Sequence, residues 1–153
     1  MLTLGNVSDA GTQELLHAIC PDVHAVKGEF DLDPSLLMAK VVVHGQFRIG
    51  IISGFSIIPN DDPDALAIAA RQLDVDLLLW AGSHRLEAFE LDGKFLLNPG
   101  SITGALSHGW VDSDVVTPSF CLLDVQGLTC TIYIYSLVDD NVKVEKVVFK
   151  KEP

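Results

Sequence analysis

The amino-acid sequence predicts an α/β fold with a two-layered β core flanked by helices. Strand-like and helical patterns alternate in its first half, and a fully apolar strand follows in the middle. The last quarter holds three β-rich runs separated by short turns. With 153 residues, of which 48% are hydrophobic, the chain is long enough for a substantial core, and we expect residues 1–153 to form a single domain.

The first elements read as strand, helix and strand. Leu2–Leu4 has the pattern of a short strand, and Gly5-Asn6 after it is a loop signal. Thr12–Cys20 has helical spacing, and Val23–Val26 is a second short strand. The apolar residues on one side of the helix are Leu15, Leu16 and Ile19. This order is typical of a parallel sheet.

A hairpin and a second helix come next. Val41–Val43 and Phe47–Ile52 are β-branched-rich runs joined by a short turn. After a loop over Ser53–Asp62, Pro63 suits the first turn of a helix that Asp61 or Asp62 can cap. Asp76–Ala81 is apolar after its first residue, which predicts a strand buried on both faces.

The remaining elements are expected to be strands. Asp92-Gly93 marks a tight turn between Leu86–Leu91 and Lys94–Leu97, and a long loop over Asn98–Thr117 follows. The three closing runs, which read as an antiparallel meander, are Phe120–Val125, Thr129–Leu137 and Val142–Phe149.

Charge and cysteine content exclude several classes of function. The formal net charge is −11, so we expect no binding to nucleic acid and none to an anionic membrane surface. No apolar run is long enough to span a membrane, and the first residues do not resemble a signal peptide. The cysteines are three in number and lack metal-type spacing, which favours reduced thiols in an intracellular protein.

Polar residues follow four of the expected strands. Because sites in open α/β sheets form at the carboxyl ends of strands, Asn6, Glu29, Ser53 and His84 are candidates to converge. The side chains of Asn6 and Glu29 offer oxygen atoms as metal ligands, and His84 is the only imidazole among the four. Structural zinc normally takes four protein donors and catalytic zinc three, so we expect no functional metal and no other cofactor.

The order of several motifs resembles the vacuolar protein sorting-associated protein 29 family, the small subunits of retromer, over essentially the whole chain. This resemblance implies a metallophosphoesterase-like fold. The motifs that carry it include Gly5-Asn6, Lys27-Gly28-Glu29-Phe30-Asp31, Val43–Gly50, Asp74–Leu78, Glu87–Glu90, Asn98-Pro99-Gly100-Ser101-Ile102-Thr103-Gly104-Ala105, Pro118-Ser119-Phe120 and Asp140–Glu145.

The chain departs from the family pattern in two ways. The family begins earlier, with a strand carrying an Asp-x-His motif and a helix, so we expect this fold to lack the family's first strand and helix. The metal-ligand motifs are also eroded, because Ser53-Gly54-Phe55 replaces His-Gly-His and Ala81-Gly82-Ser83-His84 replaces Gly-His-x-His. Asn6, Glu29, Ser53 and His84 are therefore degenerate positions, and no catalytic residue is assigned.

Two apolar segments are candidate contact surfaces. Phe55-Ser56-Ile57-Ile58-Pro59 either folds under the next helix or forms a patch, and the residues alone do not decide between these. The resemblance implies that this segment seats the large α-solenoid subunit of retromer, with Ile58 at a contact position. The partner-binding residues expected here are Phe55, Ile57, Ile58 and Pro59.

The second candidate follows from the period of two in Thr131–Leu137. Ile132 and Ile134 face one side of this strand, and Tyr133, Tyr135 and Leu137 face the other. Either both faces are covered, or the tyrosine face recognises a partner. The resemblance implies a groove for regulators such as a Rab GTPase-activating protein at Leu122, Tyr135 and Val144. Tyr133, on the same side of the strand, completes the partner-binding residues expected here.

We therefore expect a non-catalytic scaffold subunit of the retromer complex in endosomal protein sorting and retrograde transport, cytoplasmic and peripheral on endosomes through its partners. One alternative is a metal-dependent phosphodiesterase with a degenerate site that uses Asn6, Glu29 and His84. Another is a free-standing protein of the same fold with no link to retromer.

Overall fold

The computed structural model describes residues 1–105 and 116–152. The strands of the N-terminal and middle parts are β1 (Leu2–Thr3), β2 (His24–Ala25), β3 (Ala39–His44), β4 (Phe47–Ile52), β5 (Leu77–Trp80), β6 (Leu86–Leu91) and β7 (Lys94–Pro99). The closing strands are β8 (Ser119–Gln126), β9 (Thr129–Val138) and β10 (Asn141–Lys150). The helices are α1 (Ala10–Ile19), the 3-10 turn η1 (Gly54–Ser56) and α2 (Pro63–Gln72).

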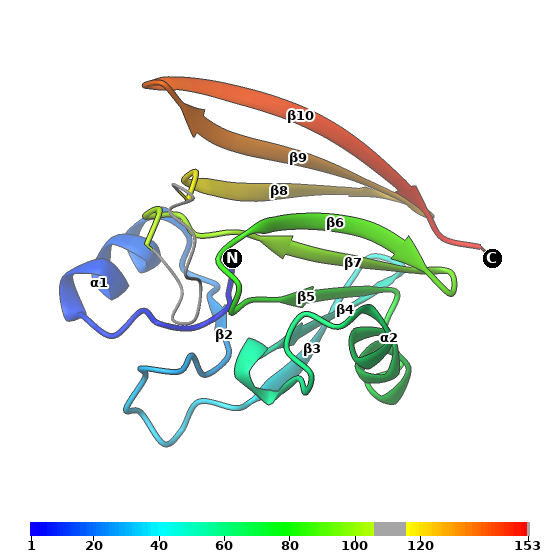
Figure 1. The fold of residues 1–153 in the computed structure, drawn as a ribbon, viewed down its shortest axis with the longest axis horizontal. Coiled ribbons are helices and arrows are strands. Elements are labelled where there is room, and N and C mark those ends of the chain that lie inside the picture. Colours follow the sequence, from blue (N-terminus) through cyan, green and yellow to red (C-terminus); the bar gives the residue numbers. More distant parts are fainter. Residues whose placement is uncertain (106–115, 153) are drawn as a thin grey trace.

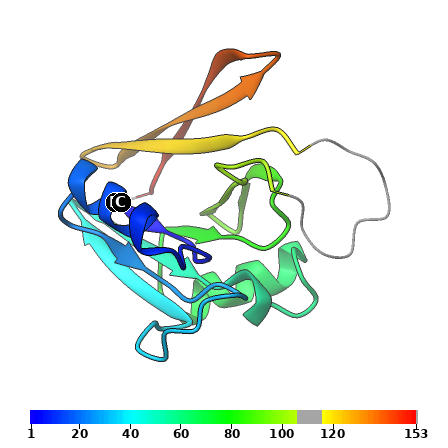
Figure 2. The same ribbon diagram turned by 90° about the vertical axis from the view of Figure 1, so that its left-hand side faces the viewer.

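The strands form two layers. The larger sheet has the order β3-β4-β5-β7-β6, in which β4, β5 and β7 run parallel and the outer pairs are antiparallel. The antiparallel sheet β10-β9-β8 and the parallel pair β1-β2 lie on one face of it. Figures 1 and 2 show β8–β10 above the larger sheet and α2 below it. The predicted two-layered α/β fold is confirmed.

The alternation of apolar side chains builds a core on each face of the larger sheet. Phe47, Ile49 and Ile51 of β4 point toward β8–β10, where they meet Ile132, Ile134 and Phe149 in one core cluster. Leu78 and Trp80 of β5 point to the other face, where Leu66, Ala69 and Ala70 of α2 cover them. Because both of its faces are covered, β5 is apolar throughout, as its sequence predicts.

The two helices differ in how they are held. Asp62 caps α2 by accepting a hydrogen bond from the Ala65 N–H at 2.8 Å, which confirms one of the two predicted caps, and Pro63 occupies the first turn. Asp9 caps α1 in the same way, through the Thr12 N–H at 2.8 Å. Unlike α2, however, α1 contributes no buried residue to either core.

Lys151, just after β10, ties the two layers together. Its Nζ lies 3.0 Å from Asp76 Oδ2 and 2.9 Å from the Gln46 carbonyl oxygen, and it sits 5.9 Å from the centre of the Phe47 ring. The Lys151 ammonium group is largely buried, so its attraction to these partners is stronger than it would be for a lysine in water. The C-terminal end of the outer sheet is thereby fixed on the larger sheet.

Most element boundaries differ from the sequence predictions by only one or two residues. The loop expected from Asn98 begins later, because β7 continues to Pro99 in register with Leu86 of β6. The central part of that loop, 106–115, lies outside the described residues. Within residues 1–105 and 116–152, neither helix has the length and apolar character needed to cross a membrane.

Candidate functional site

The loops that carry Asn6 and Glu29 adjoin one another. The backbones are so close that a Cβ on Gly28 would overlap Asn6. The Phe30 N–H donates to Asn6 Oδ1 at 3.0 Å, and Asp31 Oδ2 accepts the N–H groups of both Asn6 and Gly28 at 2.8 Å. The side-chain oxygen of Asn6 is therefore engaged in holding the loop, whereas Glu29 is exposed.

Ser53 and His84 also lie in adjoining loops. A Cβ on Gly54 would overlap the carbonyl oxygen of Ala81, so these two chain segments are in direct contact. The Ser53 hydroxyl is fully buried and has no hydrogen-bond partner among the described residues. His84 is half-buried, and its Nδ1 lies 2.8 Å from the Ala105 carbonyl oxygen. If Nδ1 carries the proton in this contact, Nε2 is left as an acceptor.

One backbone segment connects the two pairs of loops. The Lys27 N–H donates to the Leu37 carbonyl at 2.8 Å, and the Ser53 N–H donates to the next carbonyl, that of Met38, at 2.7 Å. The structure thus places the four candidate positions in loops linked through 37–38.

These four positions do not fit a metal centre. Asn6 Oδ1 is already an acceptor within the loop, and Ser53 offers a neutral hydroxyl, which is a weak ligand. Glu29 and His84 are the only carboxylate and imidazole of the set. No group of three histidine, cysteine, aspartate or glutamate side chains arranged to hold an ion occurs in the two described ranges. A zinc site normally takes three or four such donors, so the residues present fall short of one.

The segment after Ser53 carries an exposed apolar group on the side of the molecule where α2 lies. Ile58 is 85% exposed, Phe55 is 45% exposed, and Pro59 is exposed as well. We refer to Phe55, Ile58 and Pro59 as the apolar loop surface. Ile57 is only 6% exposed and packs into the core beneath α2, so it is not part of this exposed group, and its role as a contact residue stays a prediction.

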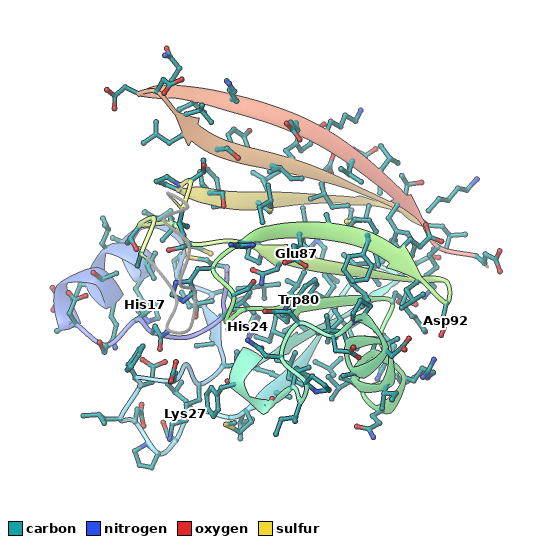
Figure 3. The ribbon with its side chains drawn as sticks, in the orientation of Figure 1. His17, His24, Lys27, Trp80, Glu87 and Asp92 are labelled. Carbon is teal, nitrogen blue, oxygen red and sulfur yellow. The ribbon has the colours of Figure 1, made fainter. Side chains whose placement is uncertain are left out.

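Trp80 fixes the segment that follows the apolar loop surface. The indole N–H of Trp80 donates to Asp61 Oδ1 at 2.8 Å, and its buried ring packs edge-to-face on Phe89 at 5.9 Å. Glu87, labelled with Trp80 in Figure 3, lies nearby. Its partial burial raises the pKa of its carboxyl group, and the negative charge of Asp61 adds to this, while Arg85 acts in the opposite direction.

A second exposed apolar group covers the outer side of β8, β9 and β10. Tyr135 is in register with Phe120 on β8 and with Val144 on β10. The rings of Phe120 and Tyr135 are stacked, with centroids 4.8 Å apart and planes 2° from parallel. In the next row, Leu122 is in register with Tyr133. The four residues predicted from the sequence, Leu122, Tyr133, Tyr135 and Val144, therefore share one face.

We refer to this group as the outer sheet face, and it is larger than predicted. Its additional apolar members are Phe120, Val142 and Val148, which are 46%, 65% and 54% exposed, and Leu137, which the period of two already places on this side, is 43% exposed. A period of two counted from Leu122 and from Val144 reaches Phe120 and Val142, so the sequence contains the signal for both. The stacking of Phe120 on Tyr135 depends on strand register, which the sequence alone does not give.

The two surfaces lie on opposite sides of the molecule. In Figure 1, η1 and α2 are at the bottom and β8–β10 at the top, and the view turned by 90° in Figure 2 shows the same separation. The larger sheet lies between them. A protein bound at one surface would therefore leave the other accessible.

Comparison with known proteins gives a consistent set of relatives. The chain is 41% identical over 152 residues to vacuolar protein sorting-associated protein 29 of Schizosaccharomyces pombe, covering 99% of this chain and 81% of the relative. Vps29 of Chaetomium thermophilum superposes with a TM-score of 0.94 at 47% identity, covering 99% of this chain and 82% of that one. Vps29 of Entamoeba histolytica, in complex with Zn²⁺, superposes with a TM-score of 0.90 at 44% identity, with coverages of 97% and 81%.

A more distant structure supports the fold. A predicted phosphoesterase from Streptococcus pneumoniae superposes with a TM-score of 0.69 over 95% of this chain and 80% of its own, at 16% identity. That likeness concerns the fold alone, and it agrees with the metallophosphoesterase-like architecture. No protein-family model matches the chain.

Proposed function

The chain belongs to the Vps29 family, and from this we propose that it is a scaffold subunit of the retromer complex. It acts in endosomal protein sorting and retrograde transport by binding other proteins, without catalysis of its own. It resides in the cytoplasm and reaches endosomes through its partners. Residues 1–153 act as one domain in this role.

The observation that carries the proposal is the exposure of Ile58. A large aliphatic side chain that is 85% exposed, beside exposed Phe55 and Pro59, leaves apolar area in water that a partner can cover. The hydrogen bond between Trp80 and Asp61 holds the following segment in place, so little ordering is needed on binding. We assign this surface to the large α-solenoid subunit of retromer, the partner that membership of the family suggests.

The outer sheet face is assigned to regulatory partners such as Rab GTPase-activating proteins. Tyrosine, leucine and valine on a rigid sheet give a contact area that loses little side-chain entropy when covered. The face lies away from the apolar loop surface, so a regulator and the solenoid can bind together. A stable interface buries at least about 1,000 Å² in total, so each partner must also contact residues around these apolar groups.

The test of the solenoid assignment is Ile58→Asp. A carboxylate at the centre of an apolar interface would remain desolvated without a counter-charge, so we expect a loss of at least about 2 kcal/mol of binding free energy. Binding is measured by pull-down and calorimetry with the purified solenoid subunit. Folding is checked by circular dichroism and thermal unfolding, which should match the wild type because the Ile58 side chain makes few contacts in the free protein.

Ile19→Asp is the matched control. Ile19 is 66% exposed on α1, away from the apolar loop surface, and the same change of residue there should leave solenoid binding unaltered. Undiminished binding by Ile58→Asp would reject the assignment of the apolar loop surface. A loss of binding by Ile19→Asp as well would mean that the effect is not specific to that surface.

A second candidate function, a metal-dependent phosphodiesterase using Asn6, Glu29 and His84, is favoured by the zinc complex of the Entamoeba histolytica relative. The donor set described above argues against it. Metal content and hydrolysis of bis(p-nitrophenyl) phosphate with added Mn²⁺ or Zn²⁺ distinguish the two functions. We expect no metal-dependent turnover. Turnover that disappears in His84→Ala would establish the enzyme instead.

A further inference from the structure

We propose that Lys146 makes the outer sheet face selective for a partner segment that carries a carboxylate next to its apolar anchor residues. This inference rests on the proposed role of that face as a docking surface for regulators. It adds the chemistry of the segment that binds there, which the apolar residues alone leave open.

The register of the strands places Lys146 among the apolar side chains. Lys146 is opposite Tyr133 on β9, and Tyr133 is opposite Leu122 on β8, so the three form one row across the sheet. The adjacent row consists of Val144, Tyr135 and Phe120. Side chains in register on neighbouring strands have Cβ atoms about 4.5–5.5 Å apart. A segment that covers Leu122 and Tyr133 therefore lies within reach of the Lys146 ammonium group.

Lys146 has no ion-pair partner within residues 1–105 and 116–152. The other charged residues on this face are Asp124 and Lys150. Asp124 lies in the row of Val148, and Lys150 lies beyond that row, so both are outside the row of Val144 and Tyr135. Asp124 already accepts a hydrogen bond from the Gln126 amide at 3.0 Å. Lys143 and Glu145 alternate with Lys146 along β10 and point to the opposite side of the sheet.

The position of this charge is unusual for the chain as a whole. The protein carries a net charge of −11, so most of its surface repels acidic segments. On the outer sheet face, by contrast, Lys146 is the one charged side chain of the described residues in the rows that hold Leu122 and Tyr135. A carboxylate placed beside the apolar anchors would be attracted here, whereas a lysine or arginine at that place would meet a like charge that has no counter-ion from the protein.

Lysine is suited to this task at the border of an apolar patch. Its methylene chain can lie against Tyr133 while the ammonium group stays in water until a partner binds. A carboxylate that pairs with it there is only partly desolvated, so the pair contributes selectivity more than affinity. The apolar residues supply most of the binding free energy, and Lys146 decides which segments use it.

The test is a selection of cyclic peptides from a random library on the wild-type protein. Peptides that lose binding to Leu122→Asp are retained, since these occupy the outer sheet face. We expect the retained peptides to carry an aspartate or glutamate within two positions of a large apolar residue more often than the unselected library does. For the tightest of them, affinity is measured by calorimetry at low and at physiological salt.

Four substitutions, two in the peptide and two in the protein, then isolate the charge. Changing the peptide carboxylate to its amide should weaken binding about threefold to tenfold, and Lys146→Glu should do the same or more. A peptide with lysine in place of the acid should bind Lys146→Glu better than it binds wild type. Lys143→Glu, a change of equal charge on the other side of the same strand, should leave the affinity within about twofold. The preference should also shrink as salt rises.

The outcomes separate the two proposals. If retained peptides show no acidic enrichment, or if Lys146→Glu and Lys143→Glu act equally, the role of Lys146 is overturned while the docking face stands. If peptides bind but none depends on Leu122, the face is not a docking surface, and both proposals fail.

Discussion

Asp31 holds the loops around Asn6 in shape. The polar groups there bind the backbone of these loops and are not arranged around an ion. One of the Asp31 carboxylate oxygens accepts two backbone N–H groups, from Asn6 and Gly28, at 2.8 Å each, and the residue is only 6% exposed. Asn6 closes the same network by accepting the Phe30 N–H. Carboxylates that accept two backbone donors in a buried setting are costly to remove, because both donors lose their partner.

We expect Asp31→Ala to lower the free energy of unfolding by about 1–3 kcal/mol, the usual cost of leaving buried donors unpaired. Urea denaturation followed by fluorescence measures this. Asp31→Asn keeps one oxygen acceptor in the same shape, so it should lose less than the alanine variant. An alanine variant as stable as wild type would show that the loop is held by other contacts.

Neighbouring residues can have opposite environments that the sequence does not reveal. Ile57 is 6% exposed and Ile58 is 85% exposed, although both are isoleucines in one loop. The difference arises from η1, where the Ile57 N–H donates to the Gly54 carbonyl at 3.1 Å and the chain turns so that Ile57 faces the core beneath α2. Irregular backbone has no period from which such an orientation could be predicted.

Among the elements, α1 was predicted with nearly correct ends but with no information on its packing. Its helical spacing puts Leu15 and Ile19 on one side, yet they are 59% and 66% exposed. A hollow of about 400 Å³, lined by Leu16, His17 and the segment Phe30–Asp33, separates the helix from β1 and β2. Spacing predicts that a helix has an apolar side, whereas tertiary contacts determine whether that side is covered.

We expect α1 to exchange its amide hydrogens much faster than α2. The two helices have ten residues each and both have an aspartate cap, but α2 buries Leu66, Ala67, Ala69 and Ala70, and α1 buries none. Local opening of α1 therefore exposes little additional apolar surface and costs little free energy. Exchange followed by mass spectrometry measures both helices in one sample. Equal protection of the two would contradict this expectation.

The strands were predicted more completely than the helices, because a period of two reports both faces of a strand at once. The pattern of Asp76–Ala81 correctly indicated burial on both faces, as seen in β5. Strand order could not be predicted in the same way. β5 pairs with β7, whereas β6 follows β5 in the sequence and lies at the edge of the sheet. The buried run in β7 and the half-exposed pattern of β6 describe each strand's own faces, but neither names the strand that pairs with β5.

For the molecule as a whole, two thiols lie at the junction of its two layers. Cys121 on β8 and Cys130 on β9 face the core between the sheets. Burial raises the pKa of each thiol from 9.0 to about 11, and the charge of Asp124 adds to the effect at Cys130. In the unfolded chain the same thiols ionise at their ordinary pKa, so the folded state binds more protons between these two values.

Stability should therefore be unaffected by these thiols below about pH 9 and should fall as the pH rises through about 11. Urea midpoints at pH 7, 9 and 10.5 measure the fall. The double variant Cys121→Ala/Cys130→Ala is the control for alkaline effects that do not involve the thiols, and its midpoint should decline less steeply. Identical slopes for the variant and the wild type would show that the thiols do not contribute.

The back-to-back placement of the apolar loop surface and the outer sheet face has a consequence for dosage. If the two surfaces bind two partners, as proposed above, the chain joins them only while its copies do not outnumber the partners. The proposed function therefore predicts that, on overproduction, one copy binds the solenoid subunit and a different copy binds the regulator, so that the two partners are no longer joined. The effect of excess protein on sorting would then resemble the effect of its loss. The cell would have to match the amount of this protein to the amounts of its two partners.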